Sequence, residues 1–156
     1  MDQEKRFLRE AVALARANIA NGGRPFGAVA VHNGEVIASG VNEMLETGDP
    51  TSHAEMNALR LAAQRLGSPR LEGVAIYASG QPCPMCLAAM RMAGITEIAY
   101  AHSNADADPY GLSTAATYAE LARPLGEQAM RFRHVPLDDT EATPLYAAWQ
   151  HRMKND

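Results

Sequence analysis

An Asn-Gly pair at positions 33 and 34 separates two short apolar runs, and it restricts the possible folds more than any other local feature. The runs extend from Phe26 to Val31 and from Glu35 to Gly40. Both central residues of a two-residue hairpin turn take a positive φ, which asparagine and glycine tolerate better than other residues. The sequence therefore predicts two strands joined by this turn.

Helical patterns and short apolar runs alternate along the rest of the chain. Strands that alternate with helices are typical of a layered α/β domain in which helices cover a mixed sheet. No internal repeat or low-complexity linker interrupts the sequence, so we expect one domain over residues 1–156. Helices are expected at residues 4–20, 51–66, 83–93, 112–121 and 145–153, and strands at 26–31, 35–40, 74–78, 95–101 and 130–135.

The composition is that of an ordinary globular protein, with 47% apolar and 21% charged residues. No apolar run is long enough to cross a bilayer, and the first ten residues are charged without an apolar signal core. We therefore expect a cytoplasmic protein that has no membrane partner. The net charge of −4 weighs against a nucleic-acid partner, because binding to a phosphate backbone requires clustered Lys and Arg.

Cys83 and Cys86 are the two cysteines of the chain, so a disulfide framework is not expected. At positions i and i+3 of a helix both sulfurs face one side, and the partial positive charge of a helix start favours thiolates. Two thiolates and an imidazole form a common zinc-binding set. The same Cys-x-x-Cys spacing after a strand also fits a thiol–disulfide oxidoreductase that uses Cys83 and Cys86.

His53 is the best candidate for a third ligand, because it lies at a helix start with Glu55 two residues on. Three protein ligands leave a fourth position open to water, which is typical of catalytic zinc sites. Glu55 is then the candidate proton carrier. Residues two apart point to opposite sides of a regular helix, so a shared site requires an irregular helix entry or a far-reaching glutamate. Ser52 and Glu55 also have the spacing of a capping box.

His-x-Glu at one helix start and Pro-Cys-x-x-Cys at the next form the signature of zinc base deaminases. Over roughly residues 5–150 the chain resembles the cytidine/deoxycytidylate deaminase-like family, and within it the small bacterial guanine deaminases. The resemblance rests on Pro25-Phe26-Gly27-Ala28-Val29, Asn42, Asp49-Pro50-Thr51, His53-Ala54-Glu55, Pro82-Cys83-Pro84-Met85-Cys86 and Ala148-Trp149.

The resemblance implies a three-layer α-β-α sandwich with a five-stranded mixed sheet and helices on both faces, and a homodimer. It implies Zn²⁺ as the cofactor, with His53, Cys83 and Cys86 as its ligands and Glu55 as the catalytic proton shuttle. The implied reaction is hydrolytic deamination of a free nucleobase or nucleoside. Guanine or a related 2-amino heterocycle is the expected substrate, and ammonia is released.

The substrate-binding residues are also expected from the resemblance. Asn42 would hold the base, Phe26 would form a wall of the pocket, and the backbone near Ala54 would help to hold the attacking water. Guanine deaminases place an acidic residue after the long loop, where this chain has Ser113 and Thr114. A hydroxyl can make one such hydrogen bond but cannot replace the charge of a carboxylate.

Other departures keep alternatives open. The family usually has Glu before Pro-Cys, and this chain has Gln81. Asp106 or Asp108 is a possible source of the missing carboxylate. A tRNA adenosine deaminase, a cytosine-type deaminase and a non-catalytic zinc-stabilised binding module all remain open as alternatives.

Overall fold

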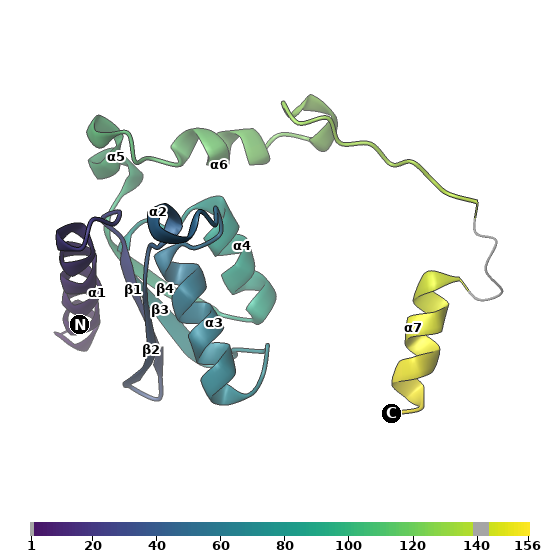
Figure 1. Cartoon of the computed structure of the whole chain (residues 1–156), viewed down its shortest axis with the longest axis horizontal. Helices are drawn as coiled ribbons and strands as arrows, with labels where there is room; N and C mark the ends of the chain where they lie inside the picture. Colours follow the sequence, from purple (N-terminus) through teal and green to yellow (C-terminus); the bar gives the residue numbers. More distant parts are fainter. Residues whose placement is uncertain (1, 139–143) are drawn as a thin grey trace. The chain divides into compact units, whose positions relative to one another are not determined.

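The computed structural model describes residues 2–138 and 144–156. Contacts divide the chain into two compact units, Met1–Arg123 and Pro124–Asp156. The first unit holds α1 (Asp2–Ala20), β1 (Gly27–His32), β2 (Glu35–Val41), α2 (Met44–Thr47), α3 (Ala54–Leu66), β3 (Val74–Gly80), α4 (Pro84–Ala93), β4 (Glu97–His102), α5 (Asn104–Ala107), a 3₁₀ turn (Asp108–Tyr110) and α6 (Ala115–Leu121); the second holds a 3₁₀ turn (Leu125–Glu127) and α7 (Leu145–Lys154) (Figure 1).

The first unit is built on a mixed sheet in the order β2-β1-β3-β4. β1 pairs antiparallel with β2 and with β3, whereas β3 and β4 are parallel. Asn33 and Gly34 have φ values of 52° and 79° in the turn between β1 and β2, so the expected hairpin is confirmed. The α/β class and the mixed sheet agree with the sequence.

The fifth strand expected at residues 130–135 is wrong: the described residues form four strands. Met130, Phe132 and Val135 are all exposed, by 67%, 73% and 66%. A strand is stabilised by a neighbour that accepts its hydrogen bonds and by an apolar layer that covers its side chains. Within the described part of its own unit this segment has neither. The single domain over 1–156 stays a prediction.

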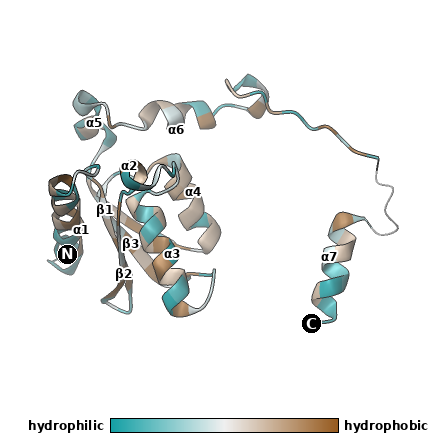
Figure 2. Cartoon of the chain, viewed as in Figure 1, coloured by the Kyte–Doolittle hydropathy of each residue, from teal (hydrophilic) through white to brown (hydrophobic). Residues whose placement is uncertain are grey.

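Two apolar layers enclose the sheet, and successive residues of β1 point into opposite layers. Val29 and Val31 pack with Phe7 of α1. Ala28 packs with Ala54 of α3, and Ala30 lies in a larger cluster that includes residues of α3 and α4. Figure 1 shows α1 and α3 on opposite sides of the strands, and Figure 2 shows that α3 carries both hydrophobic and hydrophilic residues. Helices therefore cover both faces.

Gly40 in β2 allows the start of α3 to lie directly on the sheet. A Cβ atom at this position would be 2.4 Å from the carbonyl oxygen of Ala54 and 2.7 Å from the nitrogen of Ala58. Both atoms belong to the backbone, so no side-chain rotation could relieve the contact. Glycine is therefore required here for close approach of the helix to the strand.

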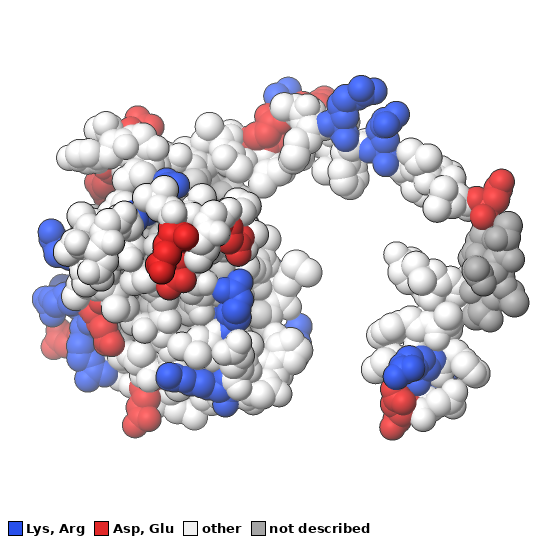
Figure 3. Space-filling model, viewed as in Figure 1, with Lys and Arg blue, Asp and Glu red and all other residues white. Residues whose placement is uncertain are grey.

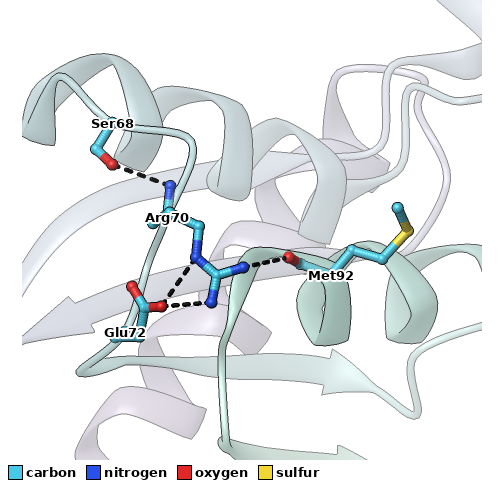
Figure 4. A network of polar contacts seen from close by, with 4 residues as sticks. All are labelled: Ser68, Arg70, Glu72 and Met92. Carbon is cyan, nitrogen blue, oxygen red and sulfur yellow. Dashed lines mark hydrogen bonds and ion pairs between the residues drawn. The ribbon is translucent and has the colours of Figure 1, made fainter. Parts of the chain in front are cut away.

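Arg70 in the loop between α3 and β3 fixes the end of α4 (Figure 4). Its Nη1 donates to the Met92 carbonyl at 3.1 Å, its Nε donates to the Glu72 carboxylate at 2.9 Å, and its backbone N donates to Ser68 Oγ at 3.0 Å. The Met92 carbonyl lies in the last turn of α4, where backbone acceptors lack helical partners. The Arg70 guanidinium therefore holds the end of α4 and forms an ion pair with the Glu72 carboxylate.

Charged side chains of both signs are interspersed over the face of the molecule shown in Figure 3. Of the helices formed by the described residues, none combines the length and the apolar character that crossing a bilayer requires.

Candidate active site

His53 and Cys83 each occupy the position immediately before a helix. His53 precedes α3 with φ −82° and ψ 154°, and Cys83 precedes α4 with φ −70° and ψ 166°. Cys86 lies in the first turn of α4 and is buried. Both helix starts therefore present their side chains to one place, although His53 and Cys83 are 30 residues apart in the sequence.

The donor atoms of these three residues form a nearly equilateral triangle. His53 Nδ1 lies 3.4 Å from Cys83 Sγ and 3.5 Å from Cys86 Sγ, and the two sulfurs are 3.5 Å apart. Around a tetrahedral zinc with bonds of about 2.3 Å to sulfur and 2.0 Å to nitrogen, ligand atoms lie roughly 3.5–3.8 Å apart. The donor types and their spacing therefore fit zinc bound by three protein ligands.

The two thiols differ in acidity because they share a hydrogen bond. The two sulfurs lie 3.5 Å apart, and the hydrogen bond between them lowers the pKa of Cys83 to about 4. The same bond, with burial, raises the pKa of Cys86 above its ordinary value. Cys83 is therefore the thiolate of the pair, and a metal that binds both sulfurs displaces the proton of Cys86.

Glu55 lies in the first turn of α3 and is only 5% exposed. The helix begins at Ala54, so His53 has an extended backbone and the two side chains are not held on opposite sides of a regular helix. Burial raises the pKa of the Glu55 carboxyl, and a hydrogen bond with Cys86 opposes part of that increase. A buried carboxyl with a raised pKa beside metal ligands is suited to moving protons near neutral pH.

The alternative interpretation of Ser52 and Glu55 as a capping box does not match the structure. The residue at the helix cap is His53, and its side chain makes no capping hydrogen bond. Ser52 Oγ instead accepts a hydrogen bond of 3.1 Å from Asn57 Nδ2. Ser52 and Glu55 therefore do not form a reciprocal capping box at the start of α3.

A cavity of about 90 Å³ opens beside these groups. Of the substrate residues expected from the sequence, four line this cavity and Ser113 does not. The Ser113 hydroxyl accepts a hydrogen bond of 3.1 Å from Ala115 N at the start of α6. The lining residues are Arg24, Phe26, Asn42, His53, Ala54, Glu55, Gln81, Cys83, Leu112 and Thr114.

Asn42 is 4% exposed, and its environment settles the orientation of its amide. Asn42 Oδ1 accepts a hydrogen bond of 3.1 Å from Met44 N, which as a backbone N–H can only donate. Its Nδ2 is then the atom left for a bound molecule. Asn42 therefore offers a hydrogen-bond donor to the cavity.

Asn104 connects two of the cavity residues. Its backbone N donates to Gln81 Oε1 at 2.9 Å, and its Oδ1 accepts from Thr114 N at 3.1 Å. On the next helix, the Tyr118 hydroxyl donates to the Pro82 carbonyl just before Cys83. These bonds hold the segment after β4 against the turn that carries the cysteines.

The chain matches a known family over residues 1–102, and that family is described as the cytidine and deoxycytidylate deaminase zinc-binding region. The chain belongs to this zinc-binding deaminase family. Zinc is accordingly its metal, and the His53, Cys83 and Cys86 group fits that metal.

Three relatives extend the match. The chain is 39% identical to guanine deaminase from Bacillus subtilis over 93% of its own length and 92% of that protein. The solved structure of that enzyme has a TM-score of 0.82 at 37% identity and covers 97% of this chain and 94% of the other. The chain is also 31% identical to a tRNA-specific adenosine deaminase from Aquifex aeolicus, over 96% and 95%. The solved structure of the protein NE0047 in complex with 2,6-diaminopurine has a TM-score of 0.66 at 30% identity. This match covers 69% of this chain and 61% of the other.

The sequence of this deaminase did not lead us to Arg24, which lines the cavity. Its position directly before the Pro25-Phe26 stretch was the available signal. The suggested carboxylates at Asp106 and Asp108 do not line the cavity. Asp106 instead accepts a hydrogen bond of 2.8 Å from Ser103 N and completes a capping box on α5.

Proposed function

We propose that this deaminase acts hydrolytically on a free nucleobase or nucleoside, with guanine or a related 2-aminopurine as its substrate. The observation that carries the proposal is the buried Glu55 carboxyl beside the His53, Cys83 and Cys86 triangle. The similarity to a guanine deaminase over nearly the whole of both chains supports the choice of substrate.

In the proposed reaction, a C–O bond forms at the ring carbon that carries the amine, and the C–N bond to that amine breaks. When bound to the three ligands, zinc supplies Lewis-acid activation of water. Glu55 takes one proton from the attacking water and transfers it to the neighbouring ring nitrogen. It carries the second water proton to the departing amine, which leaves as ammonia. Asn42 donates to the base and the Phe26 ring packs on it.

A tRNA substrate is the second candidate, because the chain is also similar to a tRNA-specific adenosine deaminase. Three arginines of the segment between residues 60 and 70 form contacts within the chain. Arg60 donates to Asn57 Oδ1 at 2.7 Å, Arg65 donates to the Ile37 carbonyl, and Arg70 pairs with Glu72. Together with the net charge of −4, this supports a small-molecule substrate.

The thiol–disulfide alternative gives no role to His53, whose Nδ1 contacts both sulfurs. One tightly bound zinc per chain without redox activity would exclude it, and zinc without ammonia release would favour the binding module. The homodimer also stays a prediction, which sedimentation of the purified protein can test.

The experiment is ammonia release from guanine, guanosine, adenine, cytosine, cytidine and tRNA, with the wild type and Glu55→Gln. Loss of the proton carrier should lower turnover of the active substrate by about 10²–10⁴-fold. Zinc content should not change, because Glu55 is not a ligand. Glu10→Gln, at an exposed site on α1, is the matched control and should retain full activity. Normal turnover by the Glu55→Gln protein would contradict the proposed role.

A further inference from the structure

Arg24 carries a positive charge to the edge of the substrate cavity. It is half-buried and lines the cavity together with Phe26 and Asn42. Its guanidinium carbon lies 5.9 Å from the centre of the Phe26 ring, within the range of a cation–π interaction. Its Nη1 lies 3.9 Å from the Met44 sulfur, which is a weak acceptor. The Arg24 side chain is therefore held beside the cavity by two weak interactions, one with an aromatic ring and one with a thioether sulfur.

The ion pairs formed by the described residues do not include Arg24. Arg70 in the same unit shows the contrast, because its guanidinium donates to a carboxylate and to a helix carbonyl. Removing a guanidinium from water without such a partner costs free energy. Glu55 is the sole carboxylate among the residues that line the cavity in the described chain. The donors of Arg24 are thus available to a bound molecule.

The backbone of Arg24 is hydrogen-bonded to a buried side chain. Asn18, a buried residue of α1, donates through Nδ2 to the Arg24 carbonyl at 2.7 Å and to the Asn42 carbonyl at 2.8 Å. A Cβ atom at Gly23 would lie 2.5 Å from that same Nδ2, so glycine leaves the space for this anchor. One buried amide therefore links the backbones of Arg24 and Asn42, the two residues whose side chains offer donors to the cavity.

We propose that Arg24 is a specificity-determining residue that binds the acceptor edge of an oxopurine, the O6 and N7 atoms of guanine. The proposal rests on the proposed function. A guanidinium contains only donors, and paired hydrogen bonds from arginine to O6 and N7 are a frequent means of recognising guanine. Adenine presents an amino group at this edge, so two donors would face each other. The edge is distinct from the 2-amino group, which leaves that group free to face Glu55.

The test compares substrates that differ in the acceptors of this edge. Guanine has both acceptors, 2-aminopurine lacks O6, and 7-deazaguanine lacks N7. Arg24→Ala should lower kcat/KM for guanine by about 5- to 150-fold, the value of one paired contact. The same substitution should change kcat/KM for 2-aminopurine and 7-deazaguanine by less than about threefold. Each of these substrates lacks one acceptor, so the wild type cannot form the paired contact with either of them. Arg24→Lys keeps the charge without the planar fork and should recover only part of the guanine activity.

The controls separate recognition from folding. Arg16→Ala removes an exposed arginine of α1 and should behave as the wild type on every substrate. Equal losses by Arg24→Ala on all three purines, or no loss on guanine, would overturn the proposal. A larger loss on guanosine monophosphate than on guanine would also overturn it, because Arg24 would then bind phosphate.

A binding measurement keeps the two proposals distinguishable. Hypoxanthine carries O6 and N7 but no 2-amino group, and purine lacks O6. In calorimetry the zinc-loaded wild type should bind hypoxanthine more tightly than purine, and Arg24→Ala should lose that preference. If neither guanine nor any other purine with a 2-amino group releases ammonia, the proposed function fails. The comparison of hypoxanthine with purine still decides the role of Arg24. A preference that survives Arg24→Ala would refute the role.

Discussion

Substituting Gly40 by alanine should damage both stability and the metal site, although Gly40 lies on a strand and touches no ligand. The added Cβ would lie 2.4 Å from the Ala54 carbonyl oxygen, whereas ordinary contacts begin at 3.4 Å. The start of α3 must therefore move away from β2 by about 1 Å, the difference between those distances. Gly40 does not have a positive φ, so the added contact alone is responsible for the effect.

The consequences follow from what α3 carries. Overpacking of this kind costs roughly 1–3 kcal/mol, which is a fall in Tm of about 2–4 °C per kcal/mol for a protein of this size. His53 precedes the displaced turn, whereas Cys83 and Cys86 belong to α4. A shift of about 1 Å between ligand groups exceeds the roughly 0.2 Å tolerance of zinc coordination and can lower activity by about 10²-fold.

Calorimetry, zinc analysis and ammonia release measure these three effects. Gly126→Ala is the matched control, because no atom lies within 4 Å of its added Cβ and its φ is not positive. That variant should be indistinguishable from the wild type. If the Gly40→Ala protein is equally stable, binds zinc and turns over normally, α3 does not lie on β2 as the structure describes.

Three further predictions concern the metal and the cavity. Cys86→Ala should lose its zinc on dialysis and unfold at a lower temperature, because a ligand held by the folded state also stabilises that state; metal analysis showing one retained zinc per chain would contradict the assignment. Chelation of zinc from the wild type should lower Tm reversibly, by the equivalent of about 2.7 kcal/mol when free zinc had been 100 times its dissociation constant; an unchanged Tm would mean that the three ligands do not hold the metal. Asn18→Ala removes the hydrogen-bond donor to the carbonyls of Arg24 and Asn42 and should lower the free energy of unfolding in urea by roughly 1–3 kcal/mol. The same substitution should raise KM more than it lowers kcat. An unchanged free energy of unfolding and unchanged kinetics would show that these two hydrogen bonds have no effect.

The sequence was informative wherever structure or chemistry depends on neighbouring residues. Asn33 and Gly34 predicted the hairpin because turn geometry depends on the φ values of two residues. The chemistry of the metal donors was also readable, because thiolate and imidazole prefer zinc whatever fold presents them. The strand expected at 130–135 failed because apolar composition alone cannot supply the neighbouring strand that a strand needs.

Only the tertiary structure decided how distant segments meet. The sequence left open whether His53 and Glu55 could share a site, and the extended backbone at His53 resolved that question. Arg24 gained significance only from its place beside the cavity and from its lack of a carboxylate partner in the described chain. Residue identity determines what a side chain can bind, whereas the packing of helices on the sheet determines which side chains face the same cavity.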